Sequence, residues 1–302
     1  MSFKRAVLSL ILLIVLVDIW YFVPPARLFV LWMAGRSPEC PLPKALRAFE
    51  NLRRYWNDSR AIRNSSRLLQ KDPSGFHLWE TPRGRFWIPS GSDEVLPVLL
   101  AEQQNNIYGS GDQAVRAGDT VLDVGANVGV FTRTALSAGA SLVVLIEPAP
   151  ENVECLRRNY AAEIVAGRVV VVPKGVWNKE DVLTMYVDPA NSAADNLFAK
   201  RKGSYERKVP LTTIDDIVAE LKLAKVTYVK IDVEGAEQQA LEGAQHTLAR
   251  WRPRLSIAVD NVPDDPVKVP ALVRKAWPGY RMACGPCRDD FSSIAPVVQY
   301  FW

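Results

Sequence analysis

Three ionisable residues at the end of one apolar segment have the types and spacing needed for proton transfer. Residues 226–237 read Val-Thr-Tyr-Val-Lys-Ile-Asp-Val-Glu-Gly-Ala-Glu, and strand alternation places Lys230, Asp232 and Glu234 on one face until the chain turns at Gly235. Charged groups at the end of a buried strand are costly unless they are solvated, paired or used in chemistry. We predict that Asp232 or Glu234 removes a proton from an acceptor, and that Lys230 tunes them or is a less favoured base.

A second group of residues predicts a site for a nucleoside that carries an amino acid. Residues 120–132 form an apolar strand, a turn with Gly125 and Gly129, and the start of a helix. The glycines permit backbone angles and a close approach that a Cβ atom would forbid, so that a ligand could lie against the main chain. Asp123 beside this turn could orient a cationic amino group. Glu147, 24 residues further on, could accept the hydroxyls of a ribose.

The elements around these residues predict an α/β fold. A β-α-β-α-β order is expected from the strands and helices within residues 120–138, 141–147, 151–160 and 168–172. The right-handed crossover rule assembles this order into half of a doubly wound, Rossmann-like sheet with helices on both faces. After the third strand, Val176 and Trp177 could form a wall for an adenine ring.

A dehydrogenase that binds a nicotinamide dinucleotide shares this topology. Its fingerprint is Gly-x-Gly-x-x-Gly, whereas residues 125–129 read Gly-Ala-Asn-Val-Gly and follow an acid by two positions. An α/β domain whose glycine turn binds nothing is the other alternative. The strand that ends in Glu147 favours a nucleoside site over both.

The chain resembles the FkbM family of S-adenosylmethionine-dependent O-methyltransferases. The matching motifs are residues 121–129, 147–148, 209–215 and 230–237 with 241–244, all within about residues 95–262. The resemblance implies a class I methyltransferase sheet that uses S-adenosylmethionine. It implies acceptor chemistry at residues 230–237, and cofactor contacts at Asp123, Gly125, Asn127, Gly129 and Glu147. We expect further cofactor contacts at the neighbouring residues Ala126, Pro148, Val176 and Trp177.

One departure from the family's pattern suggests a metal site. Where similar members tend to end the strand that follows in a glutamate, this chain has Asp260 and Asn261. Together with Asp232, they resemble the metal-binding set of cation-dependent catechol-type O-methyltransferases. Three oxygen ligands suit Mg²⁺, which could hold an acceptor hydroxyl and lower its pKa. The alternative is an ordinary turn that begins with Asp and Asn.

The N-terminal part of the chain predicts contact with a membrane. Residues 1–72 carry 12 Lys and Arg against 5 Asp and Glu, a net charge of +7 in a chain of net charge +4. Residues 6–23 form an apolar run just long enough to span a bilayer as a helix. A cleaved signal peptide competes with this interpretation, but no small-x-small site follows and the run ends in aromatic residues. Pro24 and Pro25 should end the helix, after which residues 27–33 could lie along the interface with Arg27 in water.

These features predict three regions. They are a membrane anchor at residues 1–25, a basic juxtamembrane helical arm at 26–72, and an FkbM-like methyltransferase domain at 73–302. The helical part of the arm, residues 44–71, could pack on the main domain or lie on lipid headgroups. Attachment would be single-pass or monotopic. We expect the last domain in the cytoplasm, because the flank after the apolar run is slightly richer in basic residues and because the cofactor is supplied there. A basic segment beside an apolar one favours anionic lipids, and we expect no nucleic-acid partner.

The remaining signals are weaker. Four cysteines do not make a disulfide framework for a chain of this size, and their pattern fits a reducing compartment. Cys284 and Cys287 could hold a metal or form a redox dithiol, although a plain turn is favoured. Residues 191–202 are rich in turn-forming and basic residues and could form either a lid over the acceptor or a solvated connection.

Together these residues and the resemblance predict an S-adenosylmethionine-dependent O-methyltransferase. Its acceptor would be a hydroxyl of a glycan, a lipid-linked sugar or another natural-product alcohol. Most of the acceleration would come from alignment in a dry, polarised pocket. A NAD-type Rossmann oxidoreductase and a membrane-attached binding module without activity are the alternatives. The sequence does not indicate the oligomeric state.

Overall fold

The main sheet has seven strands in the computed structural model, which describes residues 3–37, 39–188, 191 and 203–302. Their order is β12-β15-β11-β10-β4-β5-β6. The five strands from β6 to β11 are parallel, whereas β15 is antiparallel to both β11 and β12. The winding direction changes between β4 and β10, as in a doubly wound sheet. The strands are β4 Thr120–Val124, β5 Leu142–Ile146, β6 Val169–Val172, β10 Tyr228–Ile231, β11 Arg254–Ala258, β12 Met282–Cys284 and β15 Val298–Phe301.

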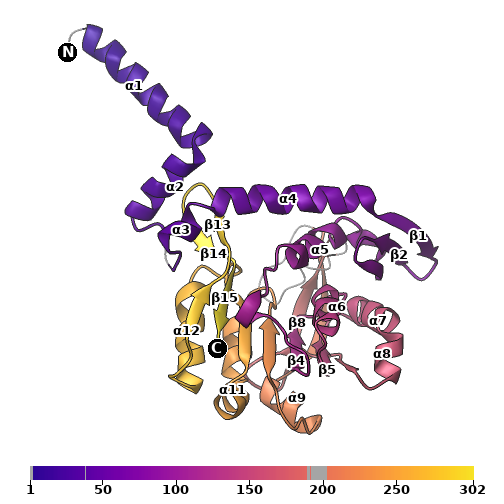
Figure 1. Cartoon of the computed structure of the whole chain (residues 1–302). Coiled ribbons are helices and arrows are strands. Elements are labelled where there is room, and N and C mark those ends of the chain that lie inside the picture. Colours follow the sequence, from indigo (N-terminus) through magenta and orange to yellow (C-terminus); the bar gives the residue numbers. More distant parts are fainter. Residues whose placement is uncertain (1–2, 38, 189–190, 192–202) are drawn as a thin grey trace.

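Helices cover both faces of this sheet, which confirms the predicted α/β class (Figure 1). Leu122 and Val124 of β4 pack in the core beneath α9 to α12, whereas Val121 points to the opposite face and packs with α6 and α7. The helical segment after residue 237 is divided into α10 and α11 at residues 243–244. The helices are α6 Val130–Ser137, α7 Pro150–Asn159, α8 Ala161–Val165, α9 Ile214–Glu220, α10 Glu237–Glu242, α11 Gln245–Trp251 and α12 Asp265–Ala276.

Smaller sheets flank the main one. They are β1 Arg67–Asp72 with β2 Phe76–Thr81 and β3 Gly84–Pro89, β7 Gly175–Val176 with β9 Tyr205–Thr212 and β8 Asp181–Val187, and β13 Cys287–Asp289 with β14 Ile294–Pro296. Helix α5, Leu96–Gln104, and 3₁₀ turns at Ser90–Ser92 and Gly111–Gln113 connect them to β4. The prediction that the helical arm reaches residue 71 is wrong. Helix α4 (Ala48–Ser65) ends earlier, and residues 67–72 form strand β1, which pairs with β2. The side chain of Asp72 accepts the Ser74 backbone N–H (2.8 Å), which closes the hairpin turn.

The N-terminus consists of two helices that meet at a sharp bend, α1 Phe3–Phe22 and α2 Pro24–Met33. Figure 1 shows α1 extending away from the rest of the chain. Within the described ranges, no helix by itself has the length and apolar character to cross a bilayer, and only α1 and α2 together do, with a bend of 97° between them. The predicted single span over residues 6–23 is therefore not supported. Pro24 and Pro25 begin a second helix, whose first turn tolerates their missing N–H groups.

Helix α2 and the short α3 (Leu42–Ala45) are attached to the C-terminal hairpin β13-β14. Cys40 is disulfide-bonded to Cys287, and Arg27 forms a buried ion pair with Asp289. The prediction that Arg27 lies in water is therefore wrong. The single Cys40–Cys287 disulfide is a pairing that the sequence analysis does not predict. The fold supplies a carboxylate that compensates the buried guanidinium. Cys284 is a free buried thiol, so it does not form a dithiol pair with Cys287.

Candidate active site

A cavity of about 630 Å³ opens where the carboxyl ends of β4, β5 and β10 meet. This position, beside the change in winding direction, is where doubly wound sheets bind ligands, and the volume lies within the usual range of about 300–1,000 Å³. The cavity brings together the two groups of residues predicted from the sequence. The predicted residues that border it are Gly125, Ala126, Asn127, Glu147, Pro148, Val176, Lys230, Asp232 and Glu234.

Lys230 joins these two groups. It lies opposite Asp123 in the parallel pairing of β10 with β4, so both side chains share one face of the sheet. The Lys230 ammonium donates to the Gly125 carbonyl at 2.7 Å, and lies 3.5 Å from Asp123 Oδ1 and 3.8 Å from Asp232 Oδ2. Burial alone would lower the pKa of Lys230, but the surrounding carboxylates outweigh burial and raise it. Lys230 is thus a cation that fixes the turn and the acids relative to each other.

Glu147 supports the turn after β4 from the end of β5. Its Oε2 accepts the Asn127 backbone N–H and its Oε1 accepts the Ala149 backbone N–H, both at 2.9 Å. Burial raises the pKa of Glu147, and these N–H groups oppose the rise. Each carboxylate oxygen has a second lone pair. Oε1 also accepts the Asn152 amide at 3.4 Å, so the second lone pair of Oε2 is the one that can accept a ligand hydroxyl at the cavity.

Two glycines of this turn serve the packing of the chain itself. A Cβ atom on Gly125 would lie 1.8 Å from the Asp232 carbonyl oxygen, and one on Gly129 would lie 2.3 Å from the Tyr160 ring. Both glycines have positive φ, +77° and +89°. The predicted backbone angles are confirmed, but protein atoms and not a ligand occupy the space that a Cβ atom would take. Gly129 does not border the cavity.

Asp123 and Trp177 also lie outside the cavity. The Thr132 hydroxyl donates to Asp123 Oδ2 at 2.6 Å, and Oδ1 faces Lys230 rather than a ligand. Trp177 packs against a cluster of side chains from β8 and β9, while its neighbour Val176 borders the cavity. Successive residues of an extended segment point to opposite sides, which explains the different places of Val176 and Trp177.

The acids after β10 lie in a turn instead of a strand. β10 ends at Ile231, and Glu234 has a φ of 54°. Asp232 and Glu234 still border the cavity together with Lys230, as the alternation pattern predicts. The Tyr108 hydroxyl donates to Asp232 Oδ2 at 2.6 Å.

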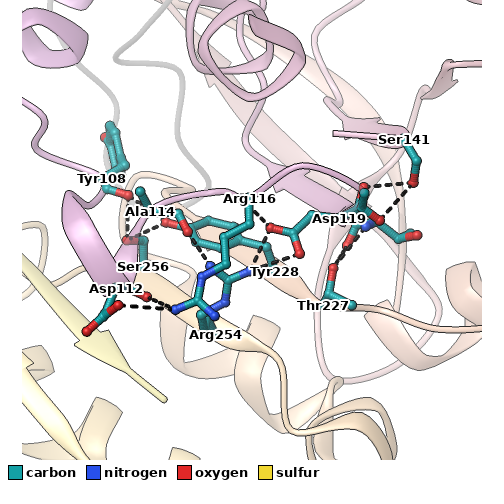
Figure 2. A network of polar contacts seen from close by, with 12 residues as sticks. Tyr108, Asp112, Ala114, Arg116, Asp119, Ser141, Thr227, Tyr228, Arg254 and Ser256 are labelled. Atoms are coloured by element: carbon teal, nitrogen blue, oxygen red, sulfur yellow. Dashed lines mark hydrogen bonds and ion pairs between the residues drawn. The ribbon is translucent and has the colours of Figure 1, made fainter. Parts of the chain in front are cut away.

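A polar network fixes Tyr108 to the main sheet, and Figure 2 shows this network. The Tyr108 carbonyl accepts the Tyr228 hydroxyl at 2.5 Å and the Ser256 hydroxyl at 3.0 Å. Tyr228 belongs to β10 and Ser256 to β11. Beside them, Arg254 forms an ion pair with Asp119 at 2.6 Å. The Tyr108 phenol is thus held in place relative to the strand that carries Lys230.

The sequence profile of the methyltransferase FkbM domain matches residues 123–282, more than half of the chain. The chain belongs to the FkbM methyltransferase family. The 31-O-demethyl-FK506 methyltransferase FkbM of Streptomyces tacrolimicus is 30% identical over 178 residues, which cover 50% of this chain and 67% of that protein. The hexuronic acid methyltransferase AglP of Haloferax volcanii is 26% identical over 160 residues, which cover 52% of this chain but only 58% of that protein.

Solved structures with a similar fold include a methyltransferase FkbM from Methylobacillus flagellatus, with a TM-score of 0.48 and 17% identity over 85% of this chain and 60% of that one. Another is SMU.1697c of Streptococcus mutans in complex with SAH, with a TM-score of 0.41 and 11% identity over 66% of this chain and 96% of that one. The family match confirms the resemblance seen in the sequence. The chain is a methyltransferase of an S-adenosylmethionine-dependent family.

The FkbM match begins at Asp123 and leaves out one wall of the cavity. Trp56 and Arg60 of α4, Glu102 of α5 and the following Tyr108 border the cavity from this side. The sequence predicts none of them as site residues, because they belong to no motif. The amphipathic pattern of residues 44–71 indicates that a helix packs on a surface, but it does not indicate which surface.

The metal set predicted from the sequence is not assembled. The Asp260 carboxylate pairs with Arg288 at 2.7 Å, and the Asn261 amide donates to Glu237 at 2.8 Å. Of the three predicted ligands, Asp232 alone borders the cavity. In the part of the chain that the structure covers, no group of three or more His, Cys, Asp and Glu side chains is arranged to hold a metal ion. The residues present therefore do not fit the predicted Mg²⁺.

The predicted lid, residues 191–202, lies outside the described residues except for Asn191. Asn191 borders the cavity.

Proposed function

We propose that this chain is an S-adenosylmethionine-dependent O-methyltransferase whose acceptor is a hydroxyl of a glycan, a lipid-linked sugar or another hydrophobic alcohol. One observation carries the proposal: a single cavity borders both the turn beside Glu147 and the acids after β10. Methyl transfer requires the donor and the acceptor in line within one pocket. That both predicted groups of residues border one cavity supports the proposal.

The cofactor side of the cavity fits a nucleoside. Glu147 would accept a ribose hydroxyl through the remaining lone pair of Oε2, and Pro148 with Val176 offers an apolar wall to a purine. The backbone of residues 125–127 would contact the amino acid part. When bound, S-adenosylmethionine supplies a methyl group that its sulfonium makes electrophilic. The carbonyl of Gly125 is held by Lys230, so this side keeps its shape before the ligand arrives.

The acceptor side fits an alcohol on an amphipathic molecule. Asp232 and Glu234 offer carboxylates, and Trp56 offers an aromatic face that is 49% exposed. An aromatic ring with one wet edge suits the apolar face of a sugar. A matched relative acts on a hexuronic acid, as its name says, which supports a sugar acceptor.

We also propose that α1 attaches the chain to a membrane. Its apolar side chains are exposed on successive turns, for example Leu8 at 68%, Leu12 at 59% and Phe22 at 80%. Exposed apolar surface of this kind marks contact with a membrane or a partner, and the basic charge that follows α1 suits anionic lipids. We place the methyltransferase domain in the cytoplasm, where its cofactor is made. Protease added to intact cells should then leave the domain intact. Digestion of the domain would place it outside the cell, an oxidising environment in which the Cys40–Cys287 disulfide would be stable.

The test of the function uses the full chain, because α4 forms part of the cavity. Calorimetry should show binding of S-adenosylmethionine and S-adenosylhomocysteine but not of NAD. Incubation with methyl-labelled S-adenosylmethionine and membranes should place the label in a lipid-extractable product, which mass spectrometry identifies. Binding of NAD alone would favour the oxidoreductase, and cofactor binding with no labelled product would favour a binding module. Label found only in a water-soluble metabolite would contradict the lipid-linked acceptor.

A further inference from the structure

Among the carboxylates that border the acceptor side of the cavity, Asp232 and Glu102 have opposite surroundings. Asp232 follows β10, inside the region that matches the FkbM profile, and Glu102 lies on α5, outside it. Both border the cavity. The group that removes the acceptor's proton needs lone pairs that are free and a carboxylate that gains from being protonated. The contacts of Asp232 and Glu102 decide between them.

One oxygen of Asp232 already has two partners. The Tyr108 hydroxyl donates to its Oδ2 at 2.6 Å, and the Lys230 ammonium lies 3.8 Å from the same oxygen. These two contacts hold Oδ2 in place and take up its lone pairs, which leaves this oxygen little access to an acceptor hydroxyl. Tyr108 cannot move away easily, because the network in Figure 2 fixes its backbone. Asp232 is thus better suited to positioning than to accepting a proton.

Glu102 has far less to stabilise its charge. In the described parts of the chain, its carboxylate has one long hydrogen bond, from the Tyr55 hydroxyl of α4 at 3.5 Å. Burial raises the pKa of Glu102 to about 8, and the charge of Asp232 adds to this rise while Lys230 opposes it. The titratable groups that face Glu102 from the neighbouring elements are Tyr55, Tyr108, Lys230, Asp232 and Asp260.

We propose that Glu102, and not Asp232, accepts the proton of the acceptor hydroxyl, and that Asp232 with Lys230 and Tyr108 positions the acceptor. This inference rests on the proposed O-methyltransferase function. The acceptor O–H bond breaks and its proton passes to Glu102, while the acceptor oxygen bonds to the methyl carbon. The bond between that carbon and the sulfonium sulfur breaks, and its electron pair stays on sulfur. Glu102 later returns the proton to water.

The first test compares Glu102→Gln with the wild-type full chain, using methyl-labelled S-adenosylmethionine and the lipid extract that the wild type labels. We expect kcat to fall by about 10²–10⁴-fold, with an unchanged KM for S-adenosylmethionine. The wild-type kcat/KM should rise with pH toward the raised pKa of Glu102, and this rise should be absent in the variant. Glu102→Asp should restore part of the activity. Glu80→Gln, an exposed carboxylate of β2 away from the cavity, is the matched control and should behave as wild type.

The second test needs no acceptor. A hydrophobic carbodiimide modifies carboxyl groups that are protonated in apolar surroundings, and peptide mass spectrometry locates the modified residue. Near neutral pH we expect modification of Glu102 and little of Asp232, with less modification at about pH 9. Preferential modification of Asp232, or wild-type kcat and pH dependence in Glu102→Gln, would overturn the assignment. If the wild type labels no acceptor, the proposed function fails, and the carbodiimide result still decides which carboxyl holds the proton.

Discussion

The two sides of the cavity differ in how their residues are brought together. The cofactor side is local in the sequence: Asn127 and Glu147, which hydrogen-bond to each other, are 20 residues apart. The acceptor side joins distant segments, since Tyr108 and Asp232 are 124 residues apart. The local side lies within the FkbM match, and much of the distant side lies before it. The cofactor side is thus built by consecutive elements, β4, α6 and β5, whereas the α4–α5 wall of the cavity lies before the matched region.

Lys230 stands between the two sides, so its replacement should have the largest effect. Lys230→Met leaves the buried carboxylate of Asp123 without its cation, which typically costs about 3–5 kcal/mol. Urea unfolding should show this loss, and calorimetry should show weaker cofactor binding because the Gly125 carbonyl is released. The double variant Lys230→Met with Asp123→Asn should recover much of the stability, because no uncompensated charge remains. A single variant as stable as wild type would contradict the coupling of these residues.

A substitution at Gly125 tests the contact between the cofactor side and the acceptor side of the cavity without a change of charge. In Gly125→Ala the Cβ atom would lie 1.8 Å from the Asp232 carbonyl oxygen, so the turn and the segment after β10 must separate. We expect a loss of about 3 kcal/mol in unfolding free energy, together with loss of methyl transfer. Gly167→Ala is the matched control, because Gly167 also has positive φ (+68°) but open space around it. That control should lose only about 1–2 kcal/mol from backbone strain and keep its activity.

The same contrast explains what could be predicted from the sequence. The β-α-β-α-β unit of β4 to β6, Glu147 at the end of its strand and Lys230 with Asp232 at the cavity follow from local periodicity and turn chemistry. Trp177 is predicted to border the cavity, but only its neighbour Val176 does, because successive side chains of an extended segment point in opposite directions. These outcomes depend only on neighbours along the chain.

The distant contacts leave no local trace in the sequence. Glu102 lies in a helix without a motif, and only the packing of α4 and α5 places it at the cavity. The sequence suggests that Asp260 is a metal ligand, but in the structure its carboxylate forms an ion pair with Arg288 of β13. Cys40 and Cys287 are separated by 247 residues, so their spacing gives no indication of a bond. A single sequence does not specify such pairs before the fold is known.

The disulfide offers a way to loosen the acceptor side alone. Cys40→Ser releases the segment before α4 from the hairpin β13-β14, and we expect a loss of about 2–3 kcal/mol in unfolding free energy. Trypsin should then cut between α2 and α4, whereas the wild type should resist. Methyl transfer should fall while S-adenosylmethionine affinity is kept, because the turn beside Glu147 lies elsewhere. Cys284→Ser, which changes a free thiol next to the same hairpin, is the control. Equal loss of cofactor affinity and transfer in Cys40→Ser would contradict the separation of the two sides.

The smallest expected effect is the pH dependence of stability that Glu102 confers. Its pKa is raised from 4.5 to about 8 in the folded chain by burial. A raised carboxyl pKa means that the folded chain holds a proton that the unfolded chain has released, so this contribution to stability is complete below about pH 4.5 and is lost as pH rises through about 8. Wild type should therefore lose stability relative to Glu102→Gln between pH 6 and 9, measured as the difference in Tm. Glu80 has a lowered pKa because Arg67 and Arg85 bind its charged form, so Glu80→Gln should show a constant difference from wild type over this range. A constant difference for Glu102→Gln as well would show that Glu102 is already ionised at neutral pH, and would remove the asymmetry between the two acids of the acceptor side.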